Sequence, residues 1–360
     1  STKMEEEKYM RRCIELAKNG LCNVAPNPMV GAVIVCDGLI IGEGYHIRCG
    51  EAHAEVNAIR SVKDKSLLSR STIYVSLEPC SHYGKTPPCA DLIVEKGIPR
   101  VVVGCMDPFA KVAGRGIRKL QEAGIEVTVG VLEAECLALN RRFITFHTHR
   151  RPYITLKWAE SADGFMDGLR TDYEKEKPYA FSTPYTRMLV HRCRAGHQAI
   201  LVGRQTALAD NPLLNLRLWP GKSPLRLVVD RNGSLPKHLA LFNDGAETRV
   251  YLDALSVHPL YGEQAGVTCV RLDFSRDILP QVLDDLYHLS VQSLLVEGGR
   301  RLLESFISAG LWDEIRVEQS PVWLKEGVPS PSWPHGRIRT TEVERHLLVH
   351  ILSSRGSSAV

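Results

Sequence analysis

The chain has 360 residues, of which 44% are hydrophobic and 24% charged, which excludes collagenous, disordered and coiled-coil chains. The length suggests two domains. No apolar run is long enough to span a membrane, and the charged start Ser1-Thr-Lys-Met-Glu-Glu-Glu shows no secretory signal, so we expect a cytoplasmic protein without a membrane partner. The net charge of +4 comes without a basic block, which does not indicate a nucleic-acid partner.

The first part of the chain predicts alternating helices and strands. The dipeptide Asp37-Gly38 is a strong hairpin signal between two of the strands. The predicted helices are 5–19, 53–63, 89–96, 116–123 and 134–146, and the predicted strands are 30–36, 39–45, 72–76, 100–104 and 126–129. This alternation implies a sheet that is covered by helices on both faces.

The polar run Thr148-His-Arg-Arg-Pro152 predicts a boundary between two domains, 1–147 and 151–360. Beyond it we predict helices at 184–193, 278–286 and 301–309, and strands at 153–158, 199–202, 225–230, 249–252, 293–297 and 314–318. These elements describe a second α/β unit, followed by a loose tail at 353–360.

Cysteines gather near the N-terminus, where eight of the ten lie in the first 140 residues. A chain of this length without a visible signal peptide rarely carries a disulfide framework, so reduced core thiols and a metal site fit better. Two short stretches supply metal ligands: His53-Ala-Glu55, and Pro79-Cys80 through Cys89. A catalytic zinc ion takes three protein ligands and keeps a fourth position for water. His53, Cys80 and Cys89 provide that set, and two thiolates balance the charge of the metal.

Glu55 is the informative residue of this cluster. Positions two apart in a helix point about 200° apart, so His53 and Glu55 cannot both bind one metal from mid-helix. We therefore expect His53 in the first turn and Glu55 beside the metal as a proton carrier. Pro87-Pro88 favours a helix start at Cys89, where a thiol ionises more easily. The alternatives are no metal, or a closed structural site with Cys49, Cys105 or His82 as fourth ligand, in which Glu55 would have no purpose.

The pattern H-x-E…P-C-x-x-C is typical of zinc nucleobase deaminases, but here eight residues separate the two cysteines. With that spacing the chain resembles the bifunctional deaminase–reductase family of riboflavin biosynthesis, along nearly its full length. The matching words of the first half are Ala25-Pro-Asn-Pro-Met-Val-Gly31, Gly42-Glu-Gly-Tyr-His46, His53-Ala-Glu-Val56 and Glu78-Pro-Cys-Ser-His-Tyr-Gly-Lys-Thr-Pro-Pro-Cys89.

For the first half, the resemblance implies a cytidine-deaminase-like three-layer domain that uses Zn²⁺. Its substrate would be a small phosphorylated pyrimidine, 2,5-diamino-6-ribosylamino-4(3H)-pyrimidinone 5′-phosphate. The positions that match substrate contacts of the family are Asn27, Ser81, His82, Lys85 and Asp107, with Lys85 suited to the phosphate. Phe109 stands where the family usually has asparagine. From the residues alone, Asn27 and Asp107, each beside a proline, are equally well explained as turn residues.

The second half has no G-x-G-x-x-G that follows a strand and opens a helix. Leu294 to Leu303 reads as a strand, a diglycine and a helix start, which fits either anion binding or a plain tight turn. The words that match the reductase half of the family are Lys157-Trp-Ala-Glu-Ser-Ala-Asp-Gly164, Ala199-Ile-Leu-Val-Gly203, Thr206-Ala-Leu-Ala-Asp-Asn-Pro212 and Leu214-Asn-Leu-Arg217.

The resemblance implies that this half is a dihydrofolate-reductase-like α/β domain, which uses NADPH to reduce the ribosyl group of the deaminated product to ribityl. The matching cofactor positions are Ala159, Thr206, Asp210, Gly299, Arg300, Arg301, Leu302, Leu303, Glu304 and Ser305. The matching substrate positions are Arg194, Leu214, Arg217 and Glu297, and two arginines suit a phosphate. Lys157 and Glu297 are expected near the reacting carbon, and Arg204 and Arg231 are the candidates for a 2′-phosphate contact.

The second half also departs from the family. Ala180-Phe-Ser-Thr183 replaces a word that contains tryptophan, and Gly168 to Tyr179 is longer and more charged than usual. The first interpretation is a bifunctional enzyme that forms a homo-oligomer, as the family does. The alternatives are a deaminase with a degenerate reductase half, a nucleic-acid base deaminase, and a zinc-stabilised binding protein.

Overall fold

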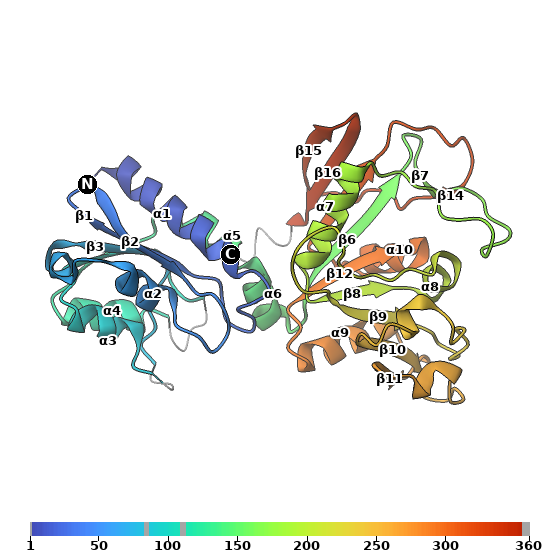
Figure 1. The fold of residues 1–360 in the computed structure, drawn as a ribbon, viewed down its shortest axis with the longest axis horizontal. Coiled ribbons are helices and arrows are strands. Elements are labelled where there is room, and N and C mark those ends of the chain that lie inside the picture. The colour runs from blue at the N-terminus through green and yellow to red at the C-terminus, as the bar shows by residue number, and fades with distance from the viewer. Residues whose placement is uncertain (1, 83–85, 109–112, 355–360) are drawn as a thin grey trace. The chain divides into compact units, whose positions relative to one another are not determined.

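The computed structural model describes residues 2–82, 86–108 and 113–354. The chain divides into two compact units, Ser1–Ile144 and Thr145–Ala359, and each has its own sheet and apolar core (Figure 1). The expectation of two α/β units is confirmed. In the part of the chain that the structure describes, no helix combines the length and the apolar character that crossing a bilayer requires.

The first unit is built on a five-stranded sheet in the order β2-β1-β3-β4-β5. Its strands are β1 (Gly31–Cys36), β2 (Leu39–Tyr45), β3 (Thr72–Leu77), β4 (Arg100–Cys105) and β5 (Glu126–Val129). β1 pairs antiparallel with both β2 and β3, whereas β3, β4 and β5 run parallel. The predicted hairpin joins β1 and β2, and Asp37 and Gly38 both have the positive φ that such a turn requires.

Helices cover both faces of this sheet and complete the three layers (Figure 1). They are α1 (Lys3–Ala17), α2 (Ala54–Ser61), α3 (Cys89–Glu95), α4 (Arg115–Glu122) and α5 (Glu133–Leu139), with 3-10 turns at Lys18–Gly20 and Lys65–Arg70. A further helix, α6 (Arg141–His149), contains the division between the two units. Alternate residues of β1 point to opposite faces: Val33 and Val35 pack with α1, and Ala32 and Ile34 pack with α2 and α3. All of β1 is therefore buried.

The prediction of one helix over 134–146 is wrong, because α5 ends at Leu139 and α6 begins at Arg141. The side chain of Asn140, between them, binds the backbone of a residue far away in sequence. The N–H of Met29 donates to Asn140 Oδ1 at 2.7 Å, and Asn140 Nδ2 donates to the carbonyl of Met29 at 2.8 Å. Helical periodicity carries no sign of such a tertiary contact.

The second unit is built on a nine-stranded sheet in the order β11-β10-β9-β8-β12-β6-β13-β16-β15. These strands are β6 (Tyr153–Glu160), β8 (Ala199–Val202), β9 (Leu225–Val229), β10 (Thr248–Asp253), β11 (Val267–Leu272), β12 (Ser293–Gly298), β13 (Glu314–Gln319), β15 (Arg337–Val343) and β16 (His346–Leu352). The strands from β11 to β13 in this order run parallel, and β16 is antiparallel to both of its neighbours, β13 and β15. A separate pair is formed by β7 (Phe165–Asp167) and β14 (Val328–Pro329).

Helices again lie on both faces of the large sheet. They are α7 (Pro184–Ala195), α8 (Arg204–Asp210), α9 (Ile278–His288) and α10 (Arg300–Ser308), with 3-10 turns at Ala240–Phe242 and Leu260–Glu263. Leu156 and Val296 share one apolar cluster with α9 and α10, whereas Ile200 and Val202 share another with Cys193 of α7 and with α8. The face with α7 and α8 carries the candidate reductase residues described below.

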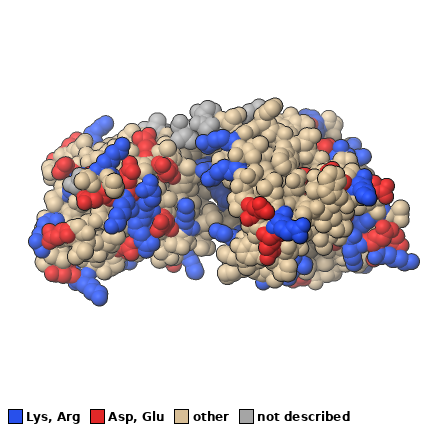
Figure 2. Space-filling model, turned by 90° about the horizontal axis from the view of Figure 1, so that it is seen from above, with Lys and Arg blue, Asp and Glu red and all other residues tan. Residues whose placement is uncertain are grey.

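Several elements of the second unit were not predicted, namely β7, α8, β11, β14, β15 and β16. α8 is only seven residues long, and the seven residues of β15 are mostly exposed and polar, so neither shows a clear apolar period. Ser353, which was expected to open a loose tail, is anchored to the fold, since its N–H donates to the carbonyl of Asp313 at 2.9 Å; residues 355–360 lie outside the described residues. On the face shown in Figure 2, lysines and arginines lie interspersed with acidic residues.

Candidate active sites

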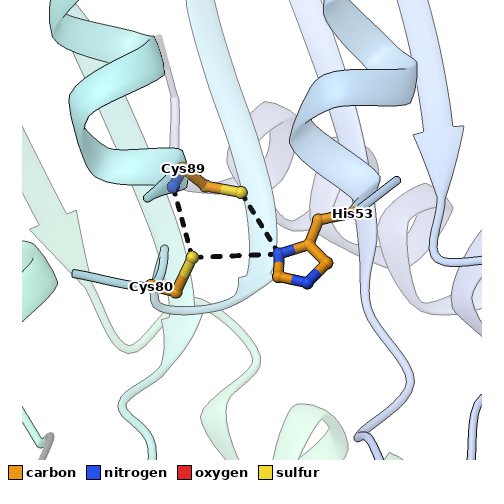
Figure 3. Close-up of side chains that lie close together, drawn as sticks. All are labelled: His53, Cys80 and Cys89. Carbon is orange, nitrogen blue, oxygen red and sulfur yellow. Dashed lines mark hydrogen bonds between the residues drawn. The ribbon is translucent and has the colours of Figure 1, made fainter. Parts of the chain in front are cut away.

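Three side chains from distant parts of the first unit converge on one point (Figure 3). His53 is the N-cap of α2, Cys89 is the first residue of α3, and Cys80 lies in the segment between β3 and α3. Pro88 is the N-cap of α3, as the prediction of a helix start at Cys89 required. The two helix starts therefore place an imidazole and a thiol beside the second thiol.

The spacing of these atoms fits a tetrahedral metal ion. His53 Nδ1 lies 3.4 Å from Cys89 Sγ and 3.8 Å from Cys80 Sγ, and all three ligand atoms lie within 4.8 Å of one another. Ligands bound tetrahedrally to zinc at about 2.0–2.3 Å are separated from one another by roughly 3.3–3.8 Å. One nitrogen and two sulfurs form a donor set that zinc accepts, so the residues present fit the ion.

The Cys80 sulfur is prepared for the ionised state that metal binding needs. It accepts the backbone N–H of Cys89 at 3.2 Å. The pKa of the Cys80 thiol is lowered to about 4, first by the hydrogen bond from the Cys89 side chain, against the effect of burial, and further by His53 and this N–H. The thiolate form of Cys80 is thus favoured before any metal binds. The expectation for Cys89 is not met, because its hydrogen bond to Cys80, and then burial, raise the pKa of the Cys89 thiol.

Glu55 lies in the first turn of α2, beside the cluster. The side chain is only 4% exposed, and it interacts with Cys80, His53 and the Cys89 thiol. Burial first, and then the charge of Cys80, raise the pKa of Glu55 to about 7. A carboxyl group that titrates near neutral pH can both accept and return a proton.

Asn27 is held in place by His46, a residue to which the sequence analysis gave no role. Asn27 Nδ2 lies 3.2 Å from His46 Nε2, and His46 Nδ1 lies 3.1 Å from the carbonyl of Ala52. Because a carbonyl only accepts, Nδ1 carries the proton and Nε2 accepts from Asn27. The His46 ring also meets the His53 ring edge-on, at 5.3 Å between centroids. Its place in the quoted word Gly42–His46 was the available signal.

Two further polar residues that the sequence analysis did not single out fix the loops around this cluster. Glu78 accepts the N–H of Asp107 at 2.9 Å and the N–H of Gly114 at 2.9 Å, and so ties the loop that carries Asp107 to the zinc loop. Asn140 fixes the turn that carries Asn27, through Met29. For Glu78 the available signal was its place at the start of the quoted word Glu78–Cys89, whereas Asn140 lies outside all the quoted words.

The other predicted residues of the first unit are only partly placed. Ser81 is half-buried and His82 is exposed, both directly after Cys80. Lys85 and Phe109 lie outside the described residues, so the predicted phosphate contact of Lys85 has no structural description here.

In the second unit, Lys157 and Glu297 lie on neighbouring strands, directly after the paired residues Leu156 and Val296 of β6 and β12. Since Leu156 and Val296 belong to the core on the α9 and α10 side, Lys157 and Glu297 point to the opposite face. The Lys157 charge helps to stabilise the Glu297 carboxylate. The structure therefore brings together the two residues predicted near the reacting carbon.

Arg194 of α7 joins this pair through Glu297. Its Nε and Nη2 donate to the two carboxylate oxygens at 3.0 and 2.8 Å, and its Nη1 donates to the carbonyl of Asn215 at 3.1 Å. Burial alone would raise the pKa of Glu297, but the Arg194 guanidinium, with Lys157, holds it below its usual value. Arg194 therefore connects β12 with the loop that carries Leu214 and Arg217.

In that loop Leu214 is buried, and its φ of 54° lies in the left-handed region. Arg217 is exposed, and its Nη1 donates to Asn215 Oδ1 at 2.6 Å. The backbone N–H of Arg217 donates to Nδ1 of His191, a buried histidine of α7 that the sequence analysis did not single out. Its only signal in the sequence is that it stands three residues before Arg194, on the same side of the helix.

The predicted cofactor turn lies where β8 and β12 end. The N–H of Gly203 donates to the carbonyl of Gly298 at 2.9 Å, and the Gly298–Gly299 peptide is cis. Gly298 has a φ of 140°, which favours glycine, and a Cβ at Gly299 would come within 2.9 Å of Thr206 Oγ1, so that the Thr206 side chain would have to move. Thr206 and Gly299, both predicted as cofactor residues, therefore lie side by side. Ala159, a third predicted cofactor residue, is half-buried on β6.

The remaining predicted cofactor residues have mixed surroundings. Gly299 is the N-cap of α10, and Arg300 pairs with Glu304 at 3.0 Å. The side chain of Leu303 is packed in the core, Leu302 is half-buried, and Arg301 and Ser305 are exposed. Ser305 Oγ donates to the carbonyl of Arg301 at 2.8 Å. The first turn of α10 is therefore the part that lies at the strand ends.

Asp210 is engaged by the segment that departs from the family pattern. Arg170 donates to Asp210, to Asp167 Oδ2 at 2.9 Å and to the carbonyl of Ala209 at 3.1 Å. The word Ala180–Thr183 is also anchored, since Ser182 Oγ donates to Glu318 Oε1 at 2.7 Å and Thr183 caps α7. These departures are ordered parts of the second unit.

The two candidates for a 2′-phosphate contact differ in their surroundings. Arg204 directly follows Gly203, and its Nε donates to Ser234 Oγ at 3.2 Å. Arg231 lies over the ring of Phe274 at 5.7 Å and 3.6 Å from Asp253. Arg204 is therefore the candidate adjacent to the predicted cofactor turn.

Family models match both halves of the chain. Residues 3–105 match the cytidine and deoxycytidylate deaminase zinc-binding region, and residues 152–344 match the RibD C-terminal domain. Among curated proteins, the riboflavin biosynthesis protein RibD of Bacillus amyloliquefaciens is 40% identical over 331 residues, which cover 91% of this chain and 87% of that protein. The RibD of Aquifex aeolicus is 39% identical, covering 90% of this chain and 89% of its own.

Solved structures give the same result for the whole chain. The diaminohydroxyphosphoribosylaminopyrimidine deaminase/5-amino-6-(5-phosphoribosylamino)uracil reductase of Thermotoga maritima is similar with a TM-score of 0.86 and 37% identity, over 98% of this chain and 99% of that one. Acinetobacter baumannii RibD has a TM-score of 0.82 and 31% identity, with the same coverage. The chain belongs to the RibD family of riboflavin biosynthesis proteins, which join a zinc-dependent deaminase and an NADPH-dependent reductase in one chain.

Proposed function

We propose that the first unit deaminates 2,5-diamino-6-ribosylamino-4(3H)-pyrimidinone 5′-phosphate, with His53, Cys80 and Cys89 as the zinc ligands and Glu55 as the proton carrier. The observation that carries this proposal is the buried Glu55 carboxyl beside three ligand atoms with tetrahedral spacing. When bound, zinc makes a water molecule acidic enough to act as a nucleophile near neutral pH. Glu55 accepts the proton of that water and returns it to the departing amine, so that ammonia leaves.

The substrate of this first step is held by the loops around the zinc ligands. Asn27, oriented by His46, binds the edge of the base with its amide. Ser81 and His82, next to a zinc ligand, and Asp107, fixed through Glu78, bind the remaining polar groups. We assign the phosphate to Lys85. His46 and Glu78 do not touch the substrate. They restrict the motion of Asn27 and of the loop that carries Asp107, which favours a single bound orientation of the substrate.

In the second unit, Lys157 and Glu297 act on the sugar carbon that is reduced. Opening of the ribosylamine ring leaves a C1′=N bond, which the Lys157 ammonium polarises and to whose nitrogen it donates the proton, while Glu297, kept ionised by Arg194, positions the hydroxyl groups of the sugar. Leu214 lines the site, and Arg217 binds the phosphate, for which an exposed guanidinium at a loop tip is well suited. NADPH supplies the hydride.

The residues that would hold NADPH gather at the ends of β8 and β12. Ala159, Thr206, Asp210 and the first turn of α10 from Gly299 onward form its surroundings, where α10 directs backbone N–H groups toward an anion. Arg204 is assigned to the 2′-phosphate, because it directly follows Gly203. Arg231 is the second choice, because it follows β9 and not the cofactor turn; each arginine has an aspartate at 3.6 Å, Asp230 for Arg204 and Asp253 for Arg231.

We assign deamination to residues 1–147 and reduction to residues 151–360, in that order, in a chain that forms a homo-oligomer. Light scattering on the purified protein tests the oligomeric state. The two activities are tested separately: ammonia release from the diamino substrate, and oxidation of NADPH by the deaminated intermediate. Failure of the second reaction with pure protein would instead support the alternative of a degenerate reductase half.

A further inference from the structure

His191 is a buried polar residue of α7 for which neither the zinc chemistry nor the reductase assignment gives a role. The side chain is 2% exposed, and it lies next to Arg194 in the helix. Its Nδ1 faces two successive backbone N–H groups of a neighbouring loop, those of Arg217 at 3.0 Å and Leu218 at 3.4 Å. Both contacts reach the segment that carries the proposed phosphate ligand.

These contacts determine the protonation state of the ring. Two N–H donors can share Nδ1 only if that nitrogen carries a lone pair, so the proton of the neutral imidazole is on Nε2. Burial, together with the charges of Arg194 and Arg217, lowers the pKa of His191 to about 4. The ring is therefore neutral, and available as an acceptor, at neutral pH.

The loop that His191 holds has no regular secondary structure between Asn211 and Pro224. Other hydrogen bonds hold residues of the loop that precede Arg217: Arg194 Nη1 donates to the carbonyl of Asn215, and the N–H of Leu216 donates to Ser223 Oγ at 3.1 Å. Arg192 lies over the ring of Trp219 at 5.4 Å. His191 alone among these contacts binds the backbone N–H of Arg217 itself.

We propose that His191 is a positioning residue of the reductase, which binds the backbone of Arg217 so that its guanidinium is set in place for the substrate phosphate. The proposal rests on the proposed role of Arg217. If it holds, loss of the Nδ1 acceptor weakens substrate binding and leaves the reacting groups, Lys157 and Glu297, unchanged. The effect therefore falls on KM for the substrate rather than on kcat.

Two substitutions distinguish the acceptor from the volume of the ring. In His191→Asn, the amide oxygen occupies about the position of Nδ1 and can accept the same N–H groups. In His191→Gln, the longer side chain places its amide nearer the position of Nε2. Both are polar and similar in size, so a general cost of altering the core affects both.

The experiment is steady-state oxidation of NADPH by the full-length protein with the deaminated phosphate intermediate as substrate. We expect His191→Gln and His191→Ala to raise KM for this substrate about tenfold, with kcat and KM for NADPH within about twofold of the parent. His191→Asn should restore KM to within about threefold. If Gln and Asn behave alike, or if kcat falls as much as KM rises, the inference is wrong.

Two further variants separate the role of His191 from the proposed role of Arg217, on which it rests. Arg217→Ala should raise KM at least as much, and the double variant His191→Gln/Arg217→Ala should be no worse than Arg217→Ala. An unchanged KM in Arg217→Ala contradicts the phosphate assignment, whereas a raised KM in Arg217→Ala with a normal KM in His191→Gln contradicts only the role of His191. His197→Asn is the structural control, because this equally buried histidine places its ring nitrogens at the carbonyl of Cys193 and at Thr155 Oγ1.

Discussion

Arg194 donates hydrogen bonds from Nε and Nη2 to the two carboxylate oxygens of Glu297, at 3.0 and 2.8 Å, although the two residues are 103 positions apart in the sequence. Each side chain is 12% exposed, so the pair is shielded from solvent. The third donor of the guanidinium binds the loop that carries Arg217. One arginine therefore both keeps the carboxylate ionised and connects it to the proposed phosphate ligand.

Replacing Arg194 by lysine removes the two-point geometry and keeps the charge. We expect NADPH oxidation to fall by about 10–100-fold in kcat/KM, because a point charge cannot hold the carboxylate in one orientation. The control is Arg249→Lys. Arg249 also forms a bidentate pair, in which Nη2 and Nε donate to the two carboxylate oxygens of Asp285 at 2.8 and 3.2 Å, elsewhere in the second unit. Equal losses of activity in both variants would show that the effect is one of general stability.

The same variant has a predictable pH profile. Arg194 lowers the pKa of Glu297, so the ionised carboxylate persists to a pH below the usual range of glutamate. Weakening this interaction raises that pKa, and the acidic limb of the kcat/KM profile should move to higher pH in Arg194→Lys. A limb that stays in place, or moves to lower pH, contradicts the role given to Glu297.

Asn140 offers a test of the first unit that leaves the zinc ligands untouched. Asn140→Ala removes both hydrogen bonds to Met29 and should destabilise the protein by about 1–3 kcal/mol, because the backbone groups of Met29 lose their partners. KM for the diamino substrate should rise, since Asn27 is on the same turn, and zinc content should be unchanged. Asn243→Ala, which removes three hydrogen bonds in the second unit, two donated to backbone carbonyls and one accepted from Gln264, should leave deamination unaltered.

The ion pair of Arg226 and Asp244 gives a pH-dependent contribution to stability. Asp244 accepts two bonds from the buried Arg226 at 2.7 Å each, and these hydrogen bonds lower the pKa of the carboxyl. Asp244→Asn should lower stability by about 2 kcal/mol at pH 7, since Arg226 keeps its other partners. A carboxyl with a lowered pKa stabilises the fold above its unfolded value of about 3.9 and loses this effect as pH falls through the folded value.

The difference between parent and Asp244→Asn should therefore be full at pH 7 and shrink below about pH 4, as measured by urea unfolding at several pH values. Asp284→Asn is the control, because Asp284 is an exposed residue of α9 and should change stability by less than about 0.5 kcal/mol. A difference that grows in acid would show that the pair does not act through the Asp244 charge.

The sequence predicted the parts of this protein in which chemistry and local structure depend on short motifs. The core strands, the helix starts at His53 and Cys89 and the diglycine turn all follow from residues close together in the chain. The break at Asn140 and the roles of His46, Glu78 and His191 did not follow. Each of these side chains acts on the backbone or amide of a residue from another element, a relation that periodicity and motif spacing do not encode.

Glu55→Gln tests the central claim most directly, with Glu51→Gln, an exposed neighbour of the same site, as its control. We expect ammonia release from the diamino substrate to fall by about 10²–10⁴-fold, because the proton carrier is lost. The variant should still contain zinc by metal analysis, and it should oxidise NADPH at the parent rate when given the deaminated intermediate. Ammonia release at the parent rate by a zinc-containing Glu55→Gln protein would contradict the account.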